Sequence, residues 1–334
     1  MDDGKTAAQA EMLANRLVKK YKHLRKWAKR VETDAFRLYD RDIPEIPLLI
    51  EIYGDAAVGA LYERPYDKPE AEELVWLQAM SNATAKALDL SPDRVFLKLR
   101  KRQRGPDQYE RLKEAGETGI VKEGGLRFKV NYSDYLDSGL FLDHRKTRSL
   151  VRSQSTGRRI LNLFCYTASF SVYAAAGGAS ETDSIDLSNT YLDWAKENFT
   201  LNSQDAVMTD PLDYNGAAKP SGRNRLVRAD ALRFLSEATR SGKKWDIIIL
   251  DPPTFSNSKK MASTLDVRRD YRELLDLTLR SLSPGGVLWF STNARGFTLD
   301  PLEFPGITIE DQTEKTRDED FKDKKIRSCY TFKP

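Results

Sequence analysis

Polar and small residues follow four apolar segments in the second half of the chain, each at the point where a buried strand would end. The first segment leads into the run N-L-F-C-Y-T-A-S, Asn162 to Ser169. The second ends in Asp186, the third in Asp230, and the fourth in D-P-P-T-F, Asp251 to Phe255. Ligands of open α/β sheets bind beyond the carboxyl ends of the strands, so these residues are one candidate site.

Each part of this candidate site suggests a contact with a different portion of a nucleoside-like ligand. Small residues in the first turn let backbone amides approach a ligand at the start of a helix. Asp186, followed by Leu187 and Ser188, is placed to accept hydrogen bonds from ribose hydroxyls. Asp230 and Ala231 are placed to meet the amino group and edge of an adenine. An acid after a strand is also a common helix cap, so only the complete set indicates a ligand site.

The first turn lacks the G-x-G-x-x-G pattern of a nicotinamide-binding domain, because Ala168 stands where a glycine is expected. Dinucleotide binding, and with it an oxidoreductase, is therefore disfavoured. A methyl donor without a pyrophosphate fits better, and we expect S-adenosyl-L-methionine as the cofactor.

The elements that must position these residues alternate between strand and helix. Strands are predicted over residues 158–164, 184–188, 225–230, 245–251 and 287–292, with helices from Ala168, Ser188, Ala231 and Leu265. Two further strands are predicted within 307–315 and 326–334. The alternation predicts a doubly wound, Rossmann-like α/β domain over residues 151–334.

Residues 1–150 predict a smaller α+β domain. Apolar side chains recur every three or four residues in the first segment, which indicates one helical stripe through Leu13, Leu17, Tyr21, Leu24 and Ala28. Short strands are expected over 35–40, 47–54, 57–63 and 95–100, with a helix over 70–88. The adjacent Gly124 and Gly125, which lie between two alternating runs within 118–132, indicate a hairpin.

Lysine and arginine gather in three places although the net charge is only +4. The clusters lie between Arg16 and Arg41, between Lys98 and Arg104, and between Arg145 and Arg159. Such patches are expected where a protein neutralises phosphates, so the N-terminal domain is interpreted as an RNA-docking domain with a basic leading helix. The alternative for each cluster is a solvated helix face.

Composition excludes several other classes of protein. Hydrophobic residues make up 40% and charged residues 31% of the chain, as in soluble globular proteins. The apolar stretches are too short to span a bilayer and the first residues lack a signal-peptide pattern, so we expect a cytoplasmic protein. Two cysteines and two well-separated histidines argue against a disulfide framework or a metal site.

The motifs resemble those of the bacterial large-subunit rRNA methyltransferases. The resemblance is carried by D-P-P-T-F-S-N-S-K at 251–259, by the N-L-F-x-Y-T-x-S turn and by G-L-F-L-D-H-R at 139–145. It is strongest to the RlmK half of the bifunctional RlmKL enzymes, which methylate N7 of a guanine in 23S rRNA, and it covers nearly the whole chain. The resemblance implies a partner that is 23S rRNA or a large-subunit assembly intermediate.

Carried over to these positions, the resemblance implies roles for individual residues. The methionine part of the cofactor would be cradled by Asn162, Phe164, Tyr166, Thr167 and Ser169, with the ribose on Asp186 and the adenine on Asp230. Asp143 and Arg145 would close over the cofactor from the small domain. The chain departs from the family at Ala168, where the family has glycine. It also has no counterpart of the THUMP domain or second methyltransferase, so RNA docking is expected to use its own basic surface.

Methyl transfer to guanine N7 is an in-line displacement that needs positioning and no general base. We expect Asp251 and the backbone of Pro252 and Pro253 to hold the guanine while Phe255 stacks on it after extrusion from the helix. The alternative for Phe255 is core packing.

Other reactions stay open at this point. Cytosine C5 methylation needs a thiolate near the base, and neither Cys165 nor Cys329 adjoins the fourth-strand motif. Methylation of an exocyclic amine suits the same D-P-P-x-F motif. A non-catalytic RNA-binding assembly factor would keep the fold without turnover.

Overall fold

The computed structural model describes residues 3–62, 69–99, 116–133, 137–214, 221–256, 265–323 and 326–334. Most of the second basic cluster, residues 100–104, and the end of the fourth-strand motif, residues 257–259, lie outside these ranges. Contacts between Cα atoms divide the chain into two compact units, unit 1 at Met1–Ser138 and unit 2 at Gly139–Pro334.

Unit 1 consists of two helices, a four-stranded sheet and a separate hairpin. The helices are α1 (Asp3–Arg30) and α2 (Glu70–Leu88). The sheet has the order β1-β2-β3-β4, with β1 at Ala35–Asp40, β2 at Leu48–Tyr53, β3 at Ala56–Leu61 and β4 at Val95–Leu99. Strands β5 (Thr118–Glu123) and β6 (Leu126–Asn131) pair through a turn in which Gly124 and Gly125 both have positive φ. That backbone suits a tight two-residue hairpin, as expected.

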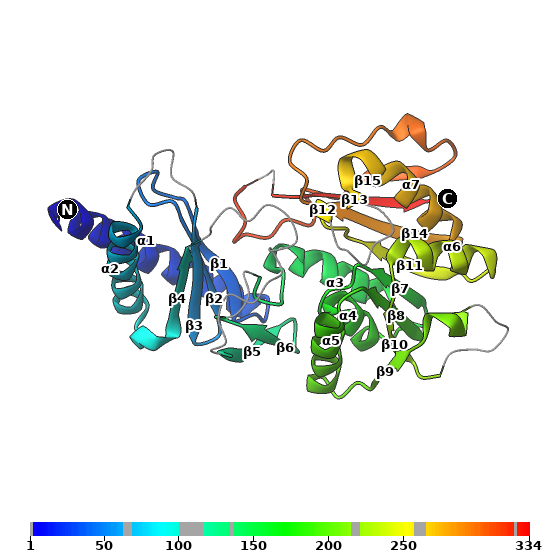
Figure 1. Cartoon of the computed structure of the whole chain (residues 1–334), viewed down its shortest axis with the longest axis horizontal. Helices are drawn as coiled ribbons and strands as arrows, with labels where there is room; N and C mark the ends of the chain where they lie inside the picture. Colours follow the sequence, from blue (N-terminus) through cyan, green and yellow to red (C-terminus); the bar gives the residue numbers. More distant parts are fainter. Residues whose placement is uncertain are drawn as a thin grey trace. The chain divides into compact units, whose positions relative to one another are not determined.

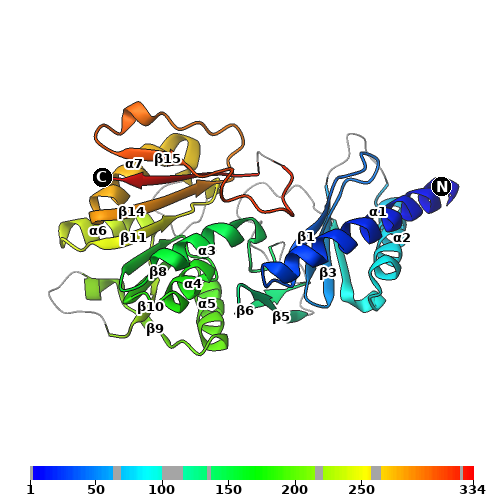
Figure 2. The same ribbon diagram turned by 180° about the vertical axis from the view of Figure 1, so that it is seen from behind.

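The core of unit 1 forms where the helices cover the sheet. Leu13, Leu17, Leu24 and Ala28 of α1 are buried, which confirms the predicted stripe, while Tyr21 is partly buried. Figure 2 shows α1 lying across the strands of this sheet. From α2, Trp76 enters the same core and its indole nitrogen donates to Gln9 on α1 at 2.7 Å. The exposed side of α1 carries many of its charged residues, together with Met12 and Val18.

Unit 2 is a doubly wound sheet of eight strands in the order β15-β16-β14-β11-β7-β8-β10-β9 (Figure 1). The strands are β7 (Arg159–Leu163), β8 (Glu181–Asp186), β9 (Ala206–Thr209), β10 (Asn224–Arg228), β11 (Trp245–Leu250), β14 (Leu282–Thr292), β15 (Thr308–Asp311) and β16 (Ser328–Lys333). All are parallel except β16, which is antiparallel to both of its neighbours. This confirms the predicted fold class, and the order reverses between β7 and β11.

Helices cover both faces of this sheet, so its central strands are buried on both sides. The helices are α3 (Arg145–Gln154), α4 (Ser169–Ala176), α5 (Asn189–Leu201), α6 (Ala231–Arg240) and α7 (Val267–Arg280). Ile247 and Ile249 of β11 pack with residues of α3 and α4, whereas Ile248 and Leu250 pack with residues of α6 and α7. Successive side chains of a strand point to opposite faces, which explains the unbroken apolar run of β11.

The domain boundary expected at 150/151 falls inside α3. The structure assigns residues from Gly139 onward to unit 2. Val151 of α3 shares a core with Phe170 and Ala174 of α4, and the Thr167 hydroxyl donates to the Gly139 carbonyl at 2.6 Å. Asp143 and Arg145 therefore belong to the larger unit, which corrects their expected origin in the small domain.

Several element boundaries differ from the sequence expectations. The helix expected from Leu265 begins at Val267, because Leu265 and Asp266 form the short strand β13, which pairs with β12 (Phe255–Ser256). The Asp266 side chain caps that helix by accepting from the Arg268 amide at 3.0 Å. Helix α3 and edge strand β9 were not expected. None of the helices in the described ranges has the length and apolar character needed to cross a bilayer.

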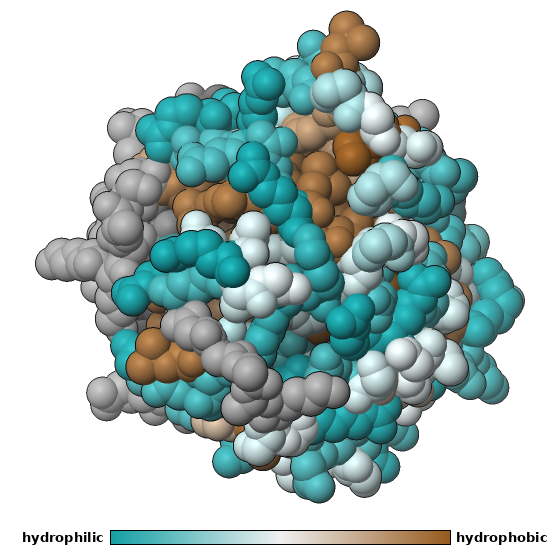
Figure 3. All heavy atoms as spheres, turned by 90° about the vertical axis from the view of Figure 1, so that its right-hand side faces the viewer, coloured by the Kyte–Doolittle hydropathy of each residue, from teal (hydrophilic) through white to brown (hydrophobic). Residues whose placement is uncertain are grey.

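The two ends of the sheet in unit 2 differ in character. Figure 3 looks onto the end at which the parallel strands begin, where hydrophilic side chains dominate and apolar ones show between them. The residues singled out from the sequence follow the opposite, carboxyl ends of the strands, as ligand sites in such sheets do.

Candidate functional site

The carboxyl ends of four strands place polar residues in one row. In the sheet, Ile185 of β8 pairs with Leu163 of β7, Leu163 with Leu250 of β11, and Leu250 with Phe290 of β14. The next residue of each strand continues the row, which gives Asp186, Phe164, Asp251 and Ser291. Neighbouring strands are about 4.8 Å apart, so Asp186 and Asp251 start about 10 Å from each other.

The turn after β7 has an unusual backbone. Phe164, Tyr166 and Ala168 have φ values of 54°, 53° and 56°, the left-handed region that side chains other than glycine rarely enter. Each such residue costs about 1–2 kcal/mol, and strain of this kind concentrates at functional sites. Ala168, where the sequence suggested a glycine, is buried and lies at the N-terminus of α4. Ser169 opens that helix and is partly exposed.

Two of the expected ligand-binding residues, Asn162 and Thr167, are buried and make hydrogen bonds that hold this turn in place. Asn162 is 2% exposed and its amide donates to the Ser171 hydroxyl at 3.0 Å. Thr167 is 1% exposed; its carbonyl accepts from Asn198 of α5 at 3.0 Å, and its hydroxyl is already engaged with Gly139. Their described contacts therefore shape the turn from below.

Asp186 is a partly exposed carboxylate that connects two segments of the site. Its Oδ2 accepts from the Tyr166 amide at 3.0 Å and its Oδ1 from the Ser188 amide at 2.9 Å. Burial raises the pKa of Asp186 to about 6, against the lowering effect of hydrogen bonds from Ser188, Tyr166 and Leu187. The carboxylate retains acceptor capacity, because each oxygen carries two lone-pair sites.

Ser188 caps α5, as predicted: its hydroxyl accepts from the Tyr191 amide at 3.4 Å.

A cluster of aromatic rings surrounds Tyr166. The Tyr166 ring lies 4.5 Å from Tyr191, 5.2 Å from Phe141 and 6.3 Å from Trp194, measured between centroids. Asp186 and the Tyr166 turn therefore adjoin an apolar wall.

Asp230 follows β10 and caps α6, accepting from the Arg233 amide at 3.0 Å. Oδ1 of Asp230 therefore acts as a helix cap, which was the alternative to a ligand contact. The adjoining Ala229 amide donates to the Asp186 carbonyl at 3.1 Å, which connects this strand end to that of β8. Ala231 is buried at the start of α6.

Asp251 is held from two sides. Ser291 on β14 donates to Oδ1 at 2.6 Å, and Nε2 of His144 lies 3.2 Å from Oδ2. Burial acts to raise the pKa of Asp251, but His144, the Ser291 hydroxyl and the charge of Arg327 outweigh it and keep the pKa below its usual value. The carboxylate is therefore ionised at neutral pH, with 25% of its side chain exposed.

The residues after Asp251 turn away from the core. Pro252 is buried and Pro253 partly so, and both fix the backbone φ angle. Phe255 in β12 pairs with Asp266 in β13, and its side chain is 50% exposed. Core packing, the alternative for Phe255, does not account for so much exposure.

Asp143 and Arg145 have partners within unit 2. Arg145 is 4% exposed and its guanidinium donates to Asp318 at 3.1 Å and to Asp320 at 3.1 and 3.2 Å. The Asp143 carbonyl accepts from Arg327 at 2.7 and 3.1 Å, and its carboxylate lies 3.5 Å from the same guanidinium. These contacts fasten the segment that carries His144.

Sequence reasoning missed His144, Ser291 and Arg327. His144 lies inside the G-L-F-L-D-H-R segment but was considered only as a metal ligand. Its pairing with Asp251 joins residues far apart in the chain, which no local pattern reveals. Ser291 was detectable, because it ends a predicted strand next to that of Asp251.

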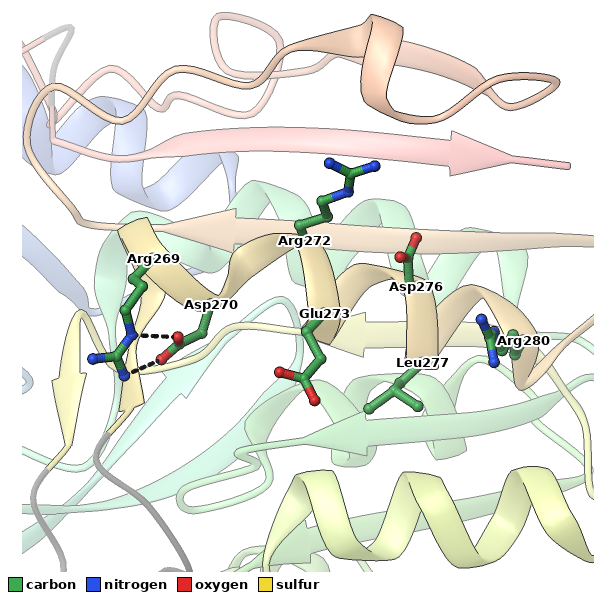
Figure 4. Close-up of a pocket in the computed structure, with 7 residues that line it drawn as sticks. All are labelled: Arg269, Asp270, Arg272, Glu273, Asp276, Leu277 and Arg280. Atoms are coloured by element: carbon green, nitrogen blue, oxygen red, sulfur yellow. Dashed lines mark hydrogen bonds and ion pairs between the residues drawn. The ribbon is translucent and has the colours of Figure 1, made fainter.

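A groove on the surface of unit 2 runs along α7 and has a different character (Figure 4). Seven residues of this one helix line it: Arg269, Asp270, Arg272, Glu273, Asp276, Leu277 and Arg280. Three arginines are balanced by three carboxylates, and Arg269 is already paired with Asp270 at 2.6 and 2.8 Å. The groove therefore presents no net charge to a ligand.

Residues 37–312 match the family model of the S-adenosylmethionine-dependent methyltransferases. The chain belongs to this family. Its cofactor is S-adenosyl-L-methionine. The chain therefore does not belong to the nicotinamide-dependent oxidoreductases.

The methyltransferase is similar over most of its length to two bacterial ribosomal RNA large subunit methyltransferases. It is 44% identical over 320 residues to ribosomal RNA large subunit methyltransferase K of Neisseria meningitidis serogroup B, covering 96% of this chain and 86% of that protein. It is 46% identical over 313 residues to ribosomal RNA large subunit methyltransferase K/L of Pseudomonas putida GB-1. That match covers 93% of this chain but 40% of the longer protein.

Solved structures show the same fold. SMU.776, described as a methyltransferase complexed with SAH, superposes with a TM-score of 0.74 at 24% identity, over 97% of this chain and 82% of that one. A methyltransferase from Streptococcus mutans superposes with a TM-score of 0.73 at 24% identity, over 97% and 81% of the two chains. Both support the Rossmann-like assignment of unit 2.

Proposed function

We propose that this methyltransferase transfers a methyl group to N7 of a guanine in 23S rRNA, either free or in an assembling large subunit. The observation that carries the proposal is the carboxylate of Asp251 at the end of β11, with its lowered pKa, followed four residues later by the half-exposed aromatic ring of Phe255. The rRNA substrate is supported by the names of the relatives in Neisseria and Pseudomonas.

The residues at the sheet edge fit S-adenosylmethionine. The acceptor capacity of Asp186 suits the ribose hydroxyls, and Leu187 and Ser188 follow it along the ligand. Asp230 Oδ2 and Ala231 suit the adenine edge. The turn from Phe164 to Ser169, at the start of α4, suits the methionine part, since a helix N-terminus attracts a carboxylate. Asn162 and Thr167 stabilise that turn through their hydrogen bonds. Asp143 and Arg145 fix the segment that carries His144 and do not contact the cofactor in this proposal.

Bound S-adenosylmethionine supplies a sulfonium methyl group. Guanine N7 already has a free lone pair, so the protein need not remove a proton from it. Orientation of reacting groups can lower a barrier by about 7–11 kcal/mol. Asp251 offsets the positive charge that forms on the base. The rigid backbone of Pro252 and Pro253 holds the base at a fixed distance from the methyl group, and Phe255 stacks on the extruded ring.

The structure argues against cytosine C5 methylation. That reaction needs an accessible thiolate. Cys165 is 6% exposed and burial raises its pKa well above the usual value. Cys329 is fully buried and burial raises its pKa too. Methylation of an exocyclic amine remains the second candidate, because Asp251 could accept a hydrogen bond from an amino group.

Helix α1 offers a surface for RNA phosphates. Lys19, Lys22, Lys26 and Lys29 repeat every three or four residues, and all four are exposed. They form a stripe about 15 Å long at 1.5 Å per residue. Arg16 and Lys20 on the same helix are instead paired with Asp42 at 2.8 and 3.0 Å. We assign RNA docking to the unbalanced stripe, which leaves the solvated-face alternative to experiment.

The substrate is tested by incubating the protein with S-adenosylmethionine labelled in the methyl group and with 23S rRNA, 16S rRNA or tRNA. We expect label in 23S rRNA alone, and no label with the Asp251→Ala variant at equal folded concentration. Label in 16S rRNA or tRNA with none in 23S rRNA contradicts the proposal. Absence of transfer to any RNA or large-subunit precursor favours the non-catalytic assembly factor.

A further inference from the structure

His144 is a buried imidazole whose two nitrogens have different surroundings. Nε2 lies 3.2 Å from Oδ2 of Asp251, whereas Nδ1 has no hydrogen-bond partner in the described part of the chain. The side chain is 2% exposed, and its ring packs edge-on against Phe170 with 5.5 Å between centroids. A buried N–H without an acceptor is costly, so a proton on Nε2, which faces Asp251, is favoured over a proton on Nδ1.

The backbone around His144 is fixed by contacts on both sides of it. Before it, the Asp143 carbonyl accepts two hydrogen bonds from Arg327. After it, Arg145 is paired with Asp318 and Asp320. The imidazole is therefore held at one position, with Asp251 as the group it can reach.

The two donors on Asp251 approach different oxygens. The Ser291 hydroxyl takes Oδ1 at 2.6 Å and His144 takes Oδ2. Two donors from separate elements, β14 and the start of α3, define the plane of the carboxylate.

We propose that His144 is a positioning residue for methyl transfer, which donates from Nε2 and orients the Asp251 carboxylate toward the target base. The proposal rests on the proposed function, because Asp251 is the group placed against the base there. Arg327, at the start of β16, is the nearby cation; its charge is shared with Asp143. His144 itself touches neither the base nor the cofactor in this account.

Three substitutions separate donation from packing. His144→Phe keeps a ring against Phe170 and removes the donor. His144→Gln places an amide N–H near the position of Nε2, and His144→Asn places it near Nδ1, out of reach of Asp251. A hydrogen bond to a charged group predicts a fall in kcat of about 10- to 100-fold for Phe and Asn. Gln should recover to within about threefold of wild type, with an unchanged KM for S-adenosylmethionine.

The pH profile distinguishes positioning from proton transfer by His144. If His144 only positions, the Gln variant keeps the wild-type profile of kcat between pH 6 and 9. A Gln variant that is as slow as the Phe variant, at the same melting temperature, overturns the proposal. So does a Phe variant with wild-type kcat.

A readout independent of activity keeps this proposal separate from the proposed function. The chain has two histidines, so ¹⁵N-histidine labelling gives two imidazole spectra, and His23→Gln assigns them. We expect an Nε2–H resonance from His144 that is moved by Asp251→Asn. A His144 with its proton on Nδ1 alone, or an Nε2–H resonance that Asp251→Asn leaves in place, overturns the proposal. Wild-type protein with the expected spectrum but no transfer to RNA refutes the proposed function alone.

Discussion

At the scale of single residues, the proposed contact of Asp186 with the ribose predicts cofactor binding that depends on pH. The pKa of its carboxyl group is raised to about 6 by burial. Ribose hydroxyls donate to the ionised form, so binding must first remove the proton when the pH lies below 6. We therefore expect the Kd for S-adenosylmethionine to rise as pH falls through 6, approaching tenfold per pH unit, as measured by calorimetry.

The Asp186→Asn variant is the control for this titration. It should bind S-adenosylmethionine weakly at every pH, without the dependence below pH 6. A wild-type Kd that stays constant between pH 5 and 8 would show that this carboxylate does not contact the ligand.

Phe255 is the second residue with a separable role. Its ring is 50% exposed, and base stacking on an aromatic side chain contributes about 1–3 kcal/mol. Phe255→Ala should lower kcat/KM for RNA by about 5- to 150-fold and leave the Kd for S-adenosylmethionine unchanged. Phe255→Trp keeps an aromatic surface and should retain most activity. Loss of cofactor binding together with activity in the Ala variant would refute the stacking role.

Side-chain pairings across the fold mark the limit of prediction at the residue scale. Ser188 was predicted as a helix cap from its place before an apolar period, because capping is a local interaction. Arg145 was assigned to the cofactor, yet its described contacts are with Asp318 and Asp320, which the chain brings back from a distant segment. No pattern near Arg145 contains that information.

At the scale of elements, the stripe on α1 has a measurable electrostatic signature. Each phosphate contact contributes about 0.7–0.9 to the slope of log K against log salt. Lys22→Gln with Lys26→Gln should make this slope less negative by about 1.5, as measured by RNA binding at several salt concentrations. The free energy of unfolding should not change, because both side chains are exposed.

A matched control removes the same charge from α7. Arg272→Gln with Arg280→Gln alters a groove whose arginines are balanced by carboxylates (Figure 4). That variant should keep the wild-type slope. Equal changes in the two variants would mean that overall charge, and not the α1 stripe, binds the RNA.

Predicted elements were most accurate where the hydrophobic pattern was strong. The central strands β7 and β11 are buried on both faces, so apolar residues dominate their sequences, as in the run from Ile247 to Leu250. Strand β9 has only four residues at the edge of the sheet, and α3 is rich in polar residues, so neither stood out. The turn at Ala168 was predicted from its neighbours, and a glycine was expected at this position. Its left-handed backbone, which glycine adopts most easily, was not predicted.

At the scale of the whole molecule, the fold and the family indicate the methyl donor more clearly than they indicate the substrate that receives the methyl group. The proposed cofactor site is the row at the sheet edge of unit 2, and the family match covers most of both units. The boundary at Ser138 and Gly139 differs from the expected one because a domain is defined by contacts, and those of Gly139 and α3 are with α4 and its preceding turn.

The identity of the methylated atom tests the account most directly. RNA methylated by the purified protein is digested to nucleosides, and the labelled product is compared by chromatography and mass spectrometry with methylated standards. The proposed function predicts N7-methylguanosine. A methyl group on an exocyclic amine or on C5 of cytosine would contradict it.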